Sequence, residues 1–460
     1  MATALQPLLD GIRRREITVG VAGLGYVGLP LALALAEAGF HVIGVDIDPL
    51  RVEALRAGRS GLDRDIDAQL AAALEQGRLR VTTSYRDLAA AAAISICVPT
   101  PLTEHKDPDL RWVEAAVGSV REVLRPGSLV TLESTTYPGT TEEIVLPALE
   151  RSGLEAGRDV FVCYSPERID PGNRRYGLRN TPKIVAGVTP ACLEAGLAFY
   201  GTVAERPVPV SSPRAAEMVK LLENTFRSVN IALANELALL CERMDIDIWE
   251  VIDAAATKPF GFMPFYPGPG TGGHCIPLDP LYLAWRARGY RFYSRFIELA
   301  ADVNDGMARH VVDRVARLLN WQGKSLRNSH LLVLGLAYKR DVADTRESPA
   351  VAVLELLRWH RADVVYHDPW VPEFRTADGT LLRSQPLTAG LVRAADCVLL
   401  TTDHSGFDYR WIARQARLVF DTRGAFRGCP GDHIHRLGSP EPSAAETLLA
   451  THLGSGASGR

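Results

Sequence analysis

The 460-residue sequence predicts an α/β protein with two Rossmann-like, doubly wound lobes joined by a long central helix. Three observations predict this class: a glycine turn between two apolar runs near the N-terminus, a long segment without glycine or proline in the middle, and a second strand–helix alternation over residues 329–430. We expect domains at 1–210, 211–325 and 326–437, and a disordered tail over the Ser/Gly/Ala-rich residues 438–460.

The first lobe opens with a βαβ unit. An apolar, β-branched strand at Ile17–Ala22 leads into a glycine turn at Gly23–Gly28, a helix that ends near Gly39 and a second strand at His41–Asp46. Short apolar runs predict three more strands of an open parallel sheet with helices on both faces, at Ala93–Val98, Leu129–Glu133 and Val160–Tyr164.

The glycine turn has the G-x-G-x-x-G spacing of a dinucleotide site. Gly23 permits the tight turn, Gly25 lets a pyrophosphate reach the N–H groups of the next helix, and Gly28 lets helix and strand pack closely. Asp46, at the end of the second strand, is placed to bind the ribose hydroxyls and to repel a 2′-phosphate, so NAD is favoured over NADP. Arg51, five residues further on, would weaken that exclusion.

The middle of the chain predicts a helical spine. Ala215–Arg243 contains no glycine or proline and is longer than a helix of a small domain needs to be. Apolar residues recur on one side at helical spacing, at Met218, Leu221, Leu222, Phe226 and Val229. The second lobe then follows, with strands predicted at His330–Gly335, Asp363–His367, Ala394–Thr402 and Leu418–Asp421 and a helix at Ser348–Trp359.

Composition excludes several classes of protein. The net charge of −3 gives no bulk attraction to nucleic acid or to an anionic membrane, so an anionic substrate needs a local basic site. Val27–Ala38 is too short to cross a bilayer and no apolar segment follows Arg13–Arg15, so we expect neither a membrane span nor a signal peptide. Seven cysteines without a C-x-x-C pair argue against disulfides and a metal site, and for a reducing compartment such as the cytoplasm.

One cysteine lies in a loop suited to chemistry. Gly272 and Gly273 precede Cys275, and Pro277 and Asp279 follow it, so a ligand can approach the thiol in a stiffened turn. Because a thiol can hold an aldehyde as a thiohemiacetal, a dehydrogenase with this nucleophile can oxidise an alcohol beyond the aldehyde. The alternative interpretation is a buried cysteine in a glycine-rich loop.

The cysteine loop and the glycine turn together resemble the nucleotide-sugar 6-dehydrogenases, the family that contains the UDP-glucose, UDP-N-acetylglucosamine and UDP-N-acetylmannosamine dehydrogenases. The resemblance extends from about residue 17 to residue 430, with its motifs in matching order. The other motifs that carry it are Val98–Pro101, Ser134–Thr140, Ser165–Arg168, Lys220 with Asn224, Leu336–Asp341 and Asp344–Ser348.

The resemblance implies oxidation of the C6 hydroxyl of a UDP-sugar to the uronic acid with two NAD⁺, through a thiohemiacetal and a thioester on Cys275. It also implies that the third domain binds the nucleotide, and that the spine helix lies at the interface of a homodimer or larger homo-oligomer. The catalytic residues carried over are Cys275, Lys220, Asn224, Asp279, Thr135 and Glu167. The expected cofactor contacts are Gly23, Gly25, Tyr26, Val27, Gly28, Asp46, Arg51, Pro99, Thr100, Thr135 and Arg346. The expected substrate contacts are Glu167, Arg168, Lys220, Asn224, Phe265, Tyr266, Gly272, Lys339 and Arg423.

Each catalytic assignment has an ordinary structural alternative. Lys220 and Asn224, spaced i, i+4, present an ammonium and an amide that stabilise an oxyanion, or else Lys220 is an exposed helix lysine. Asp279 acts as a base or holds water during thioester hydrolysis, or else caps local N–H groups. Thr135 and Glu167 follow strand ends, where they position water and move protons, or else cap their own loops.

Lys339 and Arg346 are candidates for contacts to the substrate or to a diphosphate, and their alternative is a solvated basic surface. Two departures from the family bear on the sugar: Pro171 replaces a second glutamate that many UDP-glucose members carry, and Lys258 is the only cation where those members have an upstream arginine. The stretch Ser165–Asn173 resembles the N-acetylhexosamine branch, so UDP-N-acetylglucosamine is expected ahead of UDP-glucose or dTDP-glucose.

Two other functions stay open from the sequence alone. A two-electron hydroxyacid dehydrogenase of the 6-phosphogluconate type shares the first lobe and spine but needs neither Cys275 nor a second lobe. A catalytically silent nucleotide-binding scaffold needs neither Cys275 nor Lys220 and Asn224. The number of NADH molecules formed per sugar, two, one or none, separates the three functions.

Overall fold

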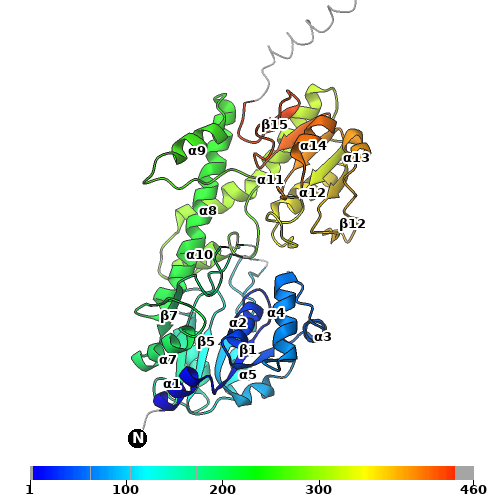
Figure 1. Cartoon of the computed structure of the whole chain (residues 1–460). Coiled ribbons are helices and arrows are strands. Elements are labelled where there is room, and N and C mark those ends of the chain that lie inside the picture. Colours follow the sequence, from blue (N-terminus) through cyan, green and yellow to red (C-terminus); the bar gives the residue numbers. More distant parts are fainter. Residues whose placement is uncertain (1–3, 63, 104, 171–172, 174, 441–460) are drawn as a thin grey trace, which may run out of the picture. The chain divides into compact units, whose positions relative to one another are not determined.

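The computed structural model describes residues 4–62, 64–103, 105–170, 173 and 175–440. The chain forms two compact units, Met1–Thr225 with Leu278–Ser294 and Phe226–Pro277 with Arg295–Arg460. The predicted spine is a single helix, α8 (Pro213–Arg243), whose residues are divided between the two units (Figure 1). Most of the predicted disordered tail, residues 441–460, lies outside the described residues.

The first unit is built on an eight-stranded sheet in the order β3-β2-β1-β4-β5-β6-β7-β8. All neighbouring strands are parallel except β6 and β7. The first six strands follow the 3-2-1-4-5-6 order of a dinucleotide-binding fold, which confirms the prediction for this lobe. The strands are β1 (Thr18–Ala22), β2 (His41–Val45), β3 (Leu79–Thr82), β4 (Ala91–Ile96), β5 (Ser128–Leu132), β6 (Val160–Tyr164), β7 (Lys183–Gly187) and β8 (Pro207–Pro209).

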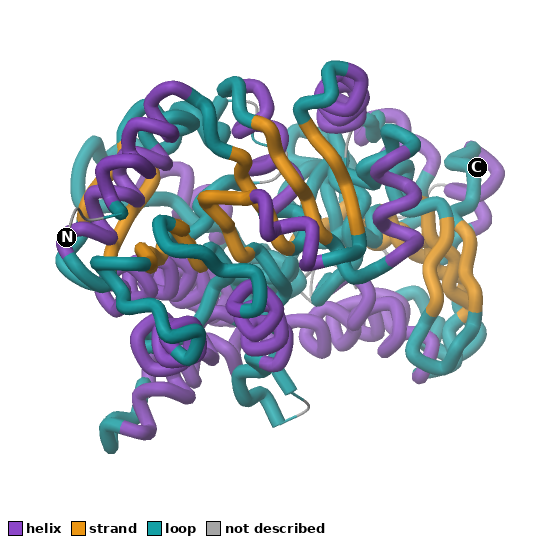
Figure 2. Tube along the Cα trace, turned by 90° about the horizontal axis from the view of Figure 1, so that it is seen from below, coloured by secondary structure: helices purple, strands orange, loops and turns teal. Residues whose placement is uncertain are grey.

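Helices cover both faces of this sheet (Figure 2). Side chains alternate along each strand, so Phe161 and Cys163 of β6 join one apolar cluster and Val160, Val162 and Tyr164 join the other. The first cluster packs against α1 (Leu5–Arg14), α2 (Gly28–Glu37), α3 (Pro49–Arg56), α4 (Arg64–Glu75) and α7 (Pro190–Tyr200). The second packs against η1 (Tyr85–Ala90), α5 (Arg111–Arg121), η2 (Thr141–Val145), α6 (Leu146–Glu150) and α10 (Asp279–Gly289).

The second unit contains a five-stranded parallel sheet in the order β10-β9-β13-β14-β15. Numbered from its first strand this is 2-1-3-4-5, the other common doubly wound order, so the second lobe is confirmed as well. Its strands are β9 (His330–Leu334), β10 (Asp363–His367), β13 (Cys397–Leu400), β14 (Val419–Asp421) and β15 (Ile434–Arg436). A separate hairpin joins β11 (Glu373–Arg375) to β12 (Leu381–Arg383).

The helices of this unit also lie on both faces of their sheet. One apolar cluster joins the sheet to α11 and α12, and another joins it to α13 and α14. Their bounds, with that of α9, are α9 (Ile248–Ala256), α11 (Arg295–Trp321), α12 (Pro349–Trp359), α13 (Ala389–Ala394) and α14 (Tyr409–Gln415). No helix in the described part of the chain has the length and apolarity needed to cross a bilayer.

The two lobes repeat one turn at the end of their first strand. Gly23 and Gly335 both take positive φ angles, 91° and 83°. The Gly23 N–H donates to the carbonyl of Val45 at 2.8 Å, and the Gly335 N–H donates to the carbonyl of His367 at 2.9 Å. Each glycine therefore leaves its first strand at the same register with the second.

The residue after each glycine is bound by an acid that ends the second strand. The Leu24 N–H donates to Asp46 at 3.0 Å, and the Leu336 N–H donates to Asp368 at 2.6 Å. The two acids differ in burial, because Asp46 is partly exposed whereas Asp368 is buried. The sequences then diverge, since the second and third glycines of the first turn have no counterpart in the second.

Candidate active site

The three glycines of the first turn are required for different reasons. A Cβ on Gly23 would lie 2.5 Å from the carbonyl oxygen of Cys97, and a Cβ on Gly28 would lie 1.8 Å from that of Gly23. Around Gly25 no heavy atom lies within 4 Å of the position of a Cβ, so this side of the turn is open. The open glycine precedes the start of α2, so the turn fits a dinucleotide whose pyrophosphate approaches the helix N-terminus.

Asp46 and Arg51 make different contacts at this turn. The carboxylate of Asp46 accepts the N–H of Leu24 at 3.0 Å and that of Asp48 at 3.1 Å, which fixes its orientation at the end of β2. The guanidinium of Arg51 donates to the carbonyl oxygens of Leu24, at 2.8 Å, and Ser60. Arg51 therefore binds backbone carbonyl oxygens of the first unit, and neither of these two hydrogen bonds is made to Asp46.

The other expected cofactor residues follow neighbouring strands of the same sheet. Pro99 and Thr100 come after β4, and Thr135 comes after β5 and is partly exposed. The carbonyl oxygen of Thr100 accepts the hydroxyl of Tyr282 at 2.7 Å. Because the carboxyl ends of parallel strands share one edge, these residues lie on the edge that carries the glycine turn.

A buried polar group lies on α8 and α10. Lys220 and Asn224 are 8% and 1% exposed, so Lys220 is not an ordinary surface lysine. The Asn224 amide donates to the carboxylate of Asp279 at 2.5 Å. Asp279 is the first residue of α10, where the helix dipole stabilises a negative charge. Asn224 and Asp279 are therefore joined in the first unit, and Lys220 lies one helical turn before Asn224 on the same side of α8.

The same face of α8 holds the loop after β5 through Glu217, a residue that sequence reasoning missed. Its carboxylate accepts the N–H groups of Gly139 at 2.6 Å and Thr141 at 2.8 Å, and the Thr141 hydroxyl at 2.7 Å. Burial raises the pKa of Glu217 from its ordinary 4.5 to about 7, although these hydrogen bonds act in the opposite direction. Glu217 lies three residues before Lys220, so helical spacing places both on one side of α8. This spacing is the sequence signal that could have identified Glu217.

Glu167 follows β6 and is held on both carboxylate oxygens. Oε1 accepts the N–H groups of Arg168 and Ile169, each at 2.6 Å, and Oε2 accepts the ammonium of Lys183 at 3.1 Å. The guanidinium of Arg168 pairs with Glu223 at 2.5 Å. The guanidinium of Arg168 also donates to a backbone carbonyl. The contact that Arg168 is expected to make with the substrate would form in addition to these two interactions.

In the second unit, the cysteine loop packs on the loop that joins β9 to α12. The Gly273 N–H donates to the carbonyl of Arg346 at 3.2 Å. A Cβ on Gly273 would lie 2.7 Å from the ring of Tyr338, and one on Gly272 would lie 2.9 Å from the carbonyl oxygen of Glu347. The two glycines thus allow the neighbouring loop to pack closely on the cysteine loop, and Cys275 itself is partly exposed.

His274 lies beside Cys275 in the same loop. Burial, and then the charge of Arg346, hold the pKa of His274 below its ordinary value. Arg346 in turn binds the carboxylate of Asp344 with three hydrogen bonds, from Nε at 3.1 and 3.2 Å and from Nη2 at 2.8 Å.

The expected substrate residues Phe265 and Tyr266 lie in an aromatic cluster. Tyr266 stacks on Trp249 with ring centroids 5.6 Å apart, and its hydroxyl donates to Asp253 at 2.7 Å. Phe265 packs edge-on against Phe226 at 5.7 Å. Tyr266 is therefore tied to its own unit on its ring face and at its hydroxyl.

Of the two departures from the UDP-glucose pattern, Lys258 lies on a surface loop, and Pro171 lies outside the described residues. The ammonium of Lys258 lies 5.0 Å from the ring centroid of Phe260, and both residues are exposed. Pro171 is not among the described residues.

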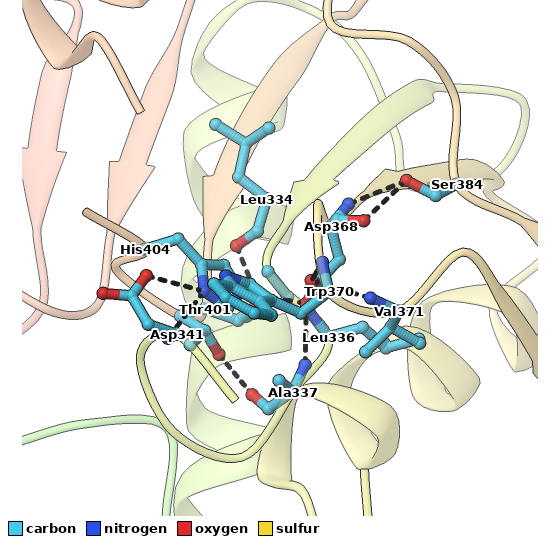
Figure 3. A network of polar contacts seen from close by, with 12 residues as sticks. Leu334, Leu336, Ala337, Asp341, Asp368, Trp370, Val371, Ser384, Thr401 and His404 are labelled. Atoms are coloured by element: carbon cyan, nitrogen blue, oxygen red, sulfur yellow. Dashed lines mark hydrogen bonds and ion pairs between the residues drawn. The ribbon is translucent and has the colours of Figure 1, made fainter. Parts of the chain in front are cut away.

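Asp368 joins the strand ends of the second lobe (Figure 3). Its Oδ2 accepts the N–H groups of Leu336 at 2.6 Å and Ala337 at 2.9 Å. Its Oδ1 accepts those of Trp370 at 2.8 Å and Val371 at 3.1 Å. Burial alone would raise the pKa of Asp368, but the hydrogen bonds from His404 and the backbone outweigh it and lower the pKa.

His404 links this acid to the next loop. The backbone N–H of Asp341 donates to its Nδ1 at 3.0 Å, so Nε2 carries the proton and donates to Asp368 at 3.0 Å (Figure 3). The loops after β9, β10 and β13 are therefore fixed by one buried hydrogen-bond network.

Basic side chains border this network. The Nε of Arg423 donates to the carbonyl of Thr401 at 2.8 Å, and its backbone N–H donates to Asp421 at 2.8 Å. Burial lowers the pKa of Arg423. Lys339 lies on the loop after β9, beside Arg340. The predicted cations Lys339 and Arg423 thus follow the carboxyl ends of strands of one sheet, where ligands bind in such folds.

No group of histidine, cysteine, aspartate and glutamate residues suited to holding a metal ion is found within the described ranges.

Three parts of the chain match one family. Residues 17–203 match the NAD binding domain of the UDP-glucose/GDP-mannose dehydrogenase family, residues 214–306 its central domain and residues 332–428 its UDP binding domain.

Similar proteins carry related names. UDP-N-acetyl-D-glucosamine 6-dehydrogenase from Pseudomonas aeruginosa is 38% identical over 359 residues, which cover 78% of this chain and 84% of that protein. UDP-N-acetyl-D-mannosamine dehydrogenase from Salmonella typhi is 37% identical over 426 residues, covering 89% and 99%. The solved structure of UDP-D-ManNAc dehydrogenase from Pyrococcus horikoshii has a TM-score of 0.84 at 33% identity, covering 92% of this chain and 99% of that one.

The fold, the glycine turn and the cysteine loop define a dehydrogenase with two doubly wound lobes, and these similarities specify which one. The chain belongs to the UDP-glucose/GDP-mannose dehydrogenase family. Its activity is that of an NAD-dependent nucleotide-sugar 6-dehydrogenase.

We expect Asp46→Asn to lower the ratio of kcat/KM with NAD⁺ to kcat/KM with NADP⁺ by about 10- to 100-fold, because a charge-assisted hydrogen bond to ribose is worth about 1.5–3 kcal/mol. Asp48→Asn, which removes an equal charge two residues away, should leave the ratio nearly unchanged. Steady-state kinetics with both cofactors measure it, and a wild type that uses NADP⁺ as well as NAD⁺ would refute the role of Asp46.

Proposed function

We propose that the enzyme oxidises the C6 hydroxyl of a nucleotide-activated hexose to the carboxylate in two steps, and that its preferred substrate is UDP-N-acetylglucosamine. The observation that carries the proposal is the partly exposed Cys275 in a loop that requires Gly272 and Gly273. Five of the other six cysteines are buried, which sets Cys275 apart from core thiols. The Pseudomonas aeruginosa relative, named for this sugar, supports the choice of substrate.

The proposed oxidation proceeds through two hydride transfers from C6. Loss of a hydride from C6 and of a proton from its hydroxyl gives an aldehyde, to which the Cys275 thiolate adds to form the oxyanion of a thiohemiacetal. Loss of a second hydride from C6 gives a thioester, and water then cleaves the C–S bond and releases the carboxylate, the thiol and one proton. NAD, when bound, accepts the hydride of each oxidation.

Side chains of the first unit supply the polar groups that this chemistry needs. The nearly buried ammonium of Lys220 favours a developing negative charge, because a buried charge without a partner is costly. Asp279 is assigned to the water step as base or water ligand, and it fixes the Asn224 amide through their hydrogen bond. Thr135 and Glu167, after β5 and β6, are assigned to positioning the same water.

The second lobe is proposed to bind the nucleotide of the substrate. The match of residues 332–428 to a UDP binding domain supports this assignment. Lys339 and Arg423 are the cations that we assign to the diphosphate, since both follow strand ends of that lobe. Seven reduced cysteines, one of them the proposed nucleophile, fit a cytoplasmic location.

We propose a homodimer formed through α8. Phe226, Leu233, Leu237 and Leu240 of α8 are all exposed, at intervals of seven, four and three residues, and the exposed Met244 follows four residues further on, just after the helix ends. This is the spacing of a helix that packs against a second helix.

The substrate is tested with a panel of sugar nucleotides and NADH absorbance. We expect the highest kcat/KM with UDP-N-acetylglucosamine, lower values with the N-acetylmannosamine and N-acetylgalactosamine isomers, and lower ones still with UDP-glucose and dTDP-glucose. Two NADH should form per sugar consumed. A higher value for the mannosamine isomer would transfer the assignment to that sugar, in line with the Salmonella typhi relative.

Cys275→Ser should lower turnover to the carboxylate by at least ~10³-fold, because serine is far less ionised than cysteine at neutral pH. Calorimetry should find NAD⁺ and substrate binding within a few-fold of wild type. Cys429→Ser, at the other partly exposed cysteine, is the matched control and should keep wild-type turnover. A Cys275→Ser enzyme that still forms two NADH per sugar at the normal rate would disprove the thioester route.

Leu237→Glu should dissociate the dimer, because it places a charge in the centre of the exposed apolar row of α8. Sedimentation equilibrium measures the association state, with the exposed neighbour Glu236→Lys as control. A wild type that sediments as a monomer would rule out this interface.

A further inference from the structure

Two buried charges of the first unit, Lys183 and Glu133, have no task in the proposed chemistry, although they form one cluster with Glu167. The ammonium of Lys183, the first residue of β7, lies 2.7 Å from the carboxylate of Glu133 and 3.1 Å from that of Glu167. The Lys183 and Glu133 side chains are 3% and 0% exposed, whereas Glu167 retains 10%. Burying a cation is costly, so its presence between two carboxylates at the edge of the cofactor-binding sheet calls for a reason.

Glu133 is held from behind by a chain of hydroxyl groups. Its Oε1 accepts the hydroxyl of Tyr200 at 2.8 Å, and Tyr200 lies 3.0 Å from the hydroxyl of Thr131. Thr131 lies 2.9 Å from the hydroxyl of Ser95. Since an ionised carboxylate only accepts, the protons point along this chain toward Glu133. The chain anchors Glu133, and through it Lys183, to β4, β5 and α7.

Glu167 lies at the other end of the cluster, at a loop that follows a strand. Two backbone N–H groups fix its Oε1, and the ammonium of Lys183 holds its Oε2. The lysine therefore sets the rotation of the carboxylate about its last bond. A carboxylate oxygen has two lone pairs, so an Oε2 held by one ammonium can accept a further hydrogen bond.

The pKa values of the two carboxylates are shifted in opposite directions. Burial raises the pKa of Glu133 above its ordinary value. For Glu167 burial acts in the same direction, but the charge of Lys183 and the backbone hydrogen bonds outweigh it and lower the pKa. The two carboxylates hold the pKa of Lys183 well above its usual range, against the effect of burial. A proton entering the cluster therefore goes to Glu133, and Glu167 stays a carboxylate.

We propose that Lys183 is a positioning residue that orients Glu167 and keeps it ionised as a hydrogen-bond acceptor, with Glu133 as the counter-ion that anchors the lysine. The proposal rests on the assignment of Glu167 to the water step. It makes Glu167 an acceptor that orients water, and leaves proton transfer to Asp279. The charged and titratable neighbours of the cluster are Cys97, Arg168, Tyr200 and Glu223.

Three variants test the role of Lys183. Lys183→Met combined with Glu133→Gln removes the lysine together with its counter-ion. The net charge of the cluster then stays at one negative unit, as in the wild type. Glu133→Gln alone keeps the lysine and still offers it an oxygen. Glu167→Gln makes the same substitution at the second carboxylate that pairs with Lys183. Thermal melting and NAD⁺ affinity report on folding, and kcat, KM and the pH dependence of kcat are measured with the best sugar nucleotide.

We expect the double variant to bind NAD⁺ normally and to lose about 10- to 100-fold in kcat, on the scale of a misplaced group. Without the lysine the pKa of Glu167 rises, so the acidic limb of the pH profile should move toward neutral pH. Glu133→Gln should keep kcat within about threefold and leave the limb in place, while Glu167→Gln should lose kcat at every pH.

A folded double variant with wild-type kcat and an unmoved acidic limb would overturn the proposal. Equal losses in Glu133→Gln and Glu167→Gln would overturn it as well, because the cluster would then act only as a structural unit. This second comparison decides the matter if the double variant does not fold. A wild type that forms no NADH from any sugar nucleotide would instead reject the proposed function itself.

Discussion

Buried carboxylates that accept backbone N–H groups hold the loops at the carboxyl ends of both sheets. A loop that leaves a parallel strand carries N–H groups without a strand partner, and each costs about 1–3 kcal/mol if it is buried unpaired. Glu167, Glu217, Asp368 and Asp421 each accept at least two such groups. The loops that face the ligands are thereby fixed by the protein itself, before any ligand is bound.

The helix α8 couples one of these structural acids to the proposed chemistry. Glu217, Lys220 and Asn224 are spaced three and four residues apart, so they share one face of a rigid helix. Glu217 fixes the loop that follows Thr135, and Asn224 fixes Asp279. A change in the position of this segment of α8 therefore moves a strand-end loop and a catalytic group together.

The elements that could be predicted were those with a strong local signal. The strands at Val160–Tyr164 and Asp363–His367 were predicted to the residue, because each is a run of five residues dominated by apolar or β-branched side chains. The strand at Cys397–Leu400 is shorter than predicted, because Ala394 ends α13. Lys183–Gly187 was not predicted, because it opens with a lysine that only the fold reveals as buried.

The residues of the candidate site also fall into those that the sequence could predict and those that it could not. Gly23 and Gly28 could be assigned from spacing, because the need for glycine arises from the local path of the backbone. Glu133, Glu217 and Asp368 could not, because acidic residues are usually exposed and only long-range packing buries these three. Lys220 was assigned by resemblance alone, and its burial is a property of the folded chain.

The repeated turn gives the molecule an internal reference. Both lobes have a glycine at the end of the first strand, a leucine after it and an aspartate that binds the leucine N–H from the end of the second strand. Features present in both copies are what this strand–turn–strand geometry demands of any sequence. Gly25 and Gly28 occur in the first copy only, and so does a partly exposed aspartate, so these features are not demanded by the shared geometry. Within one chain, the repeated turn thus separates what the common strand–turn–strand path requires from what each lobe adds to it.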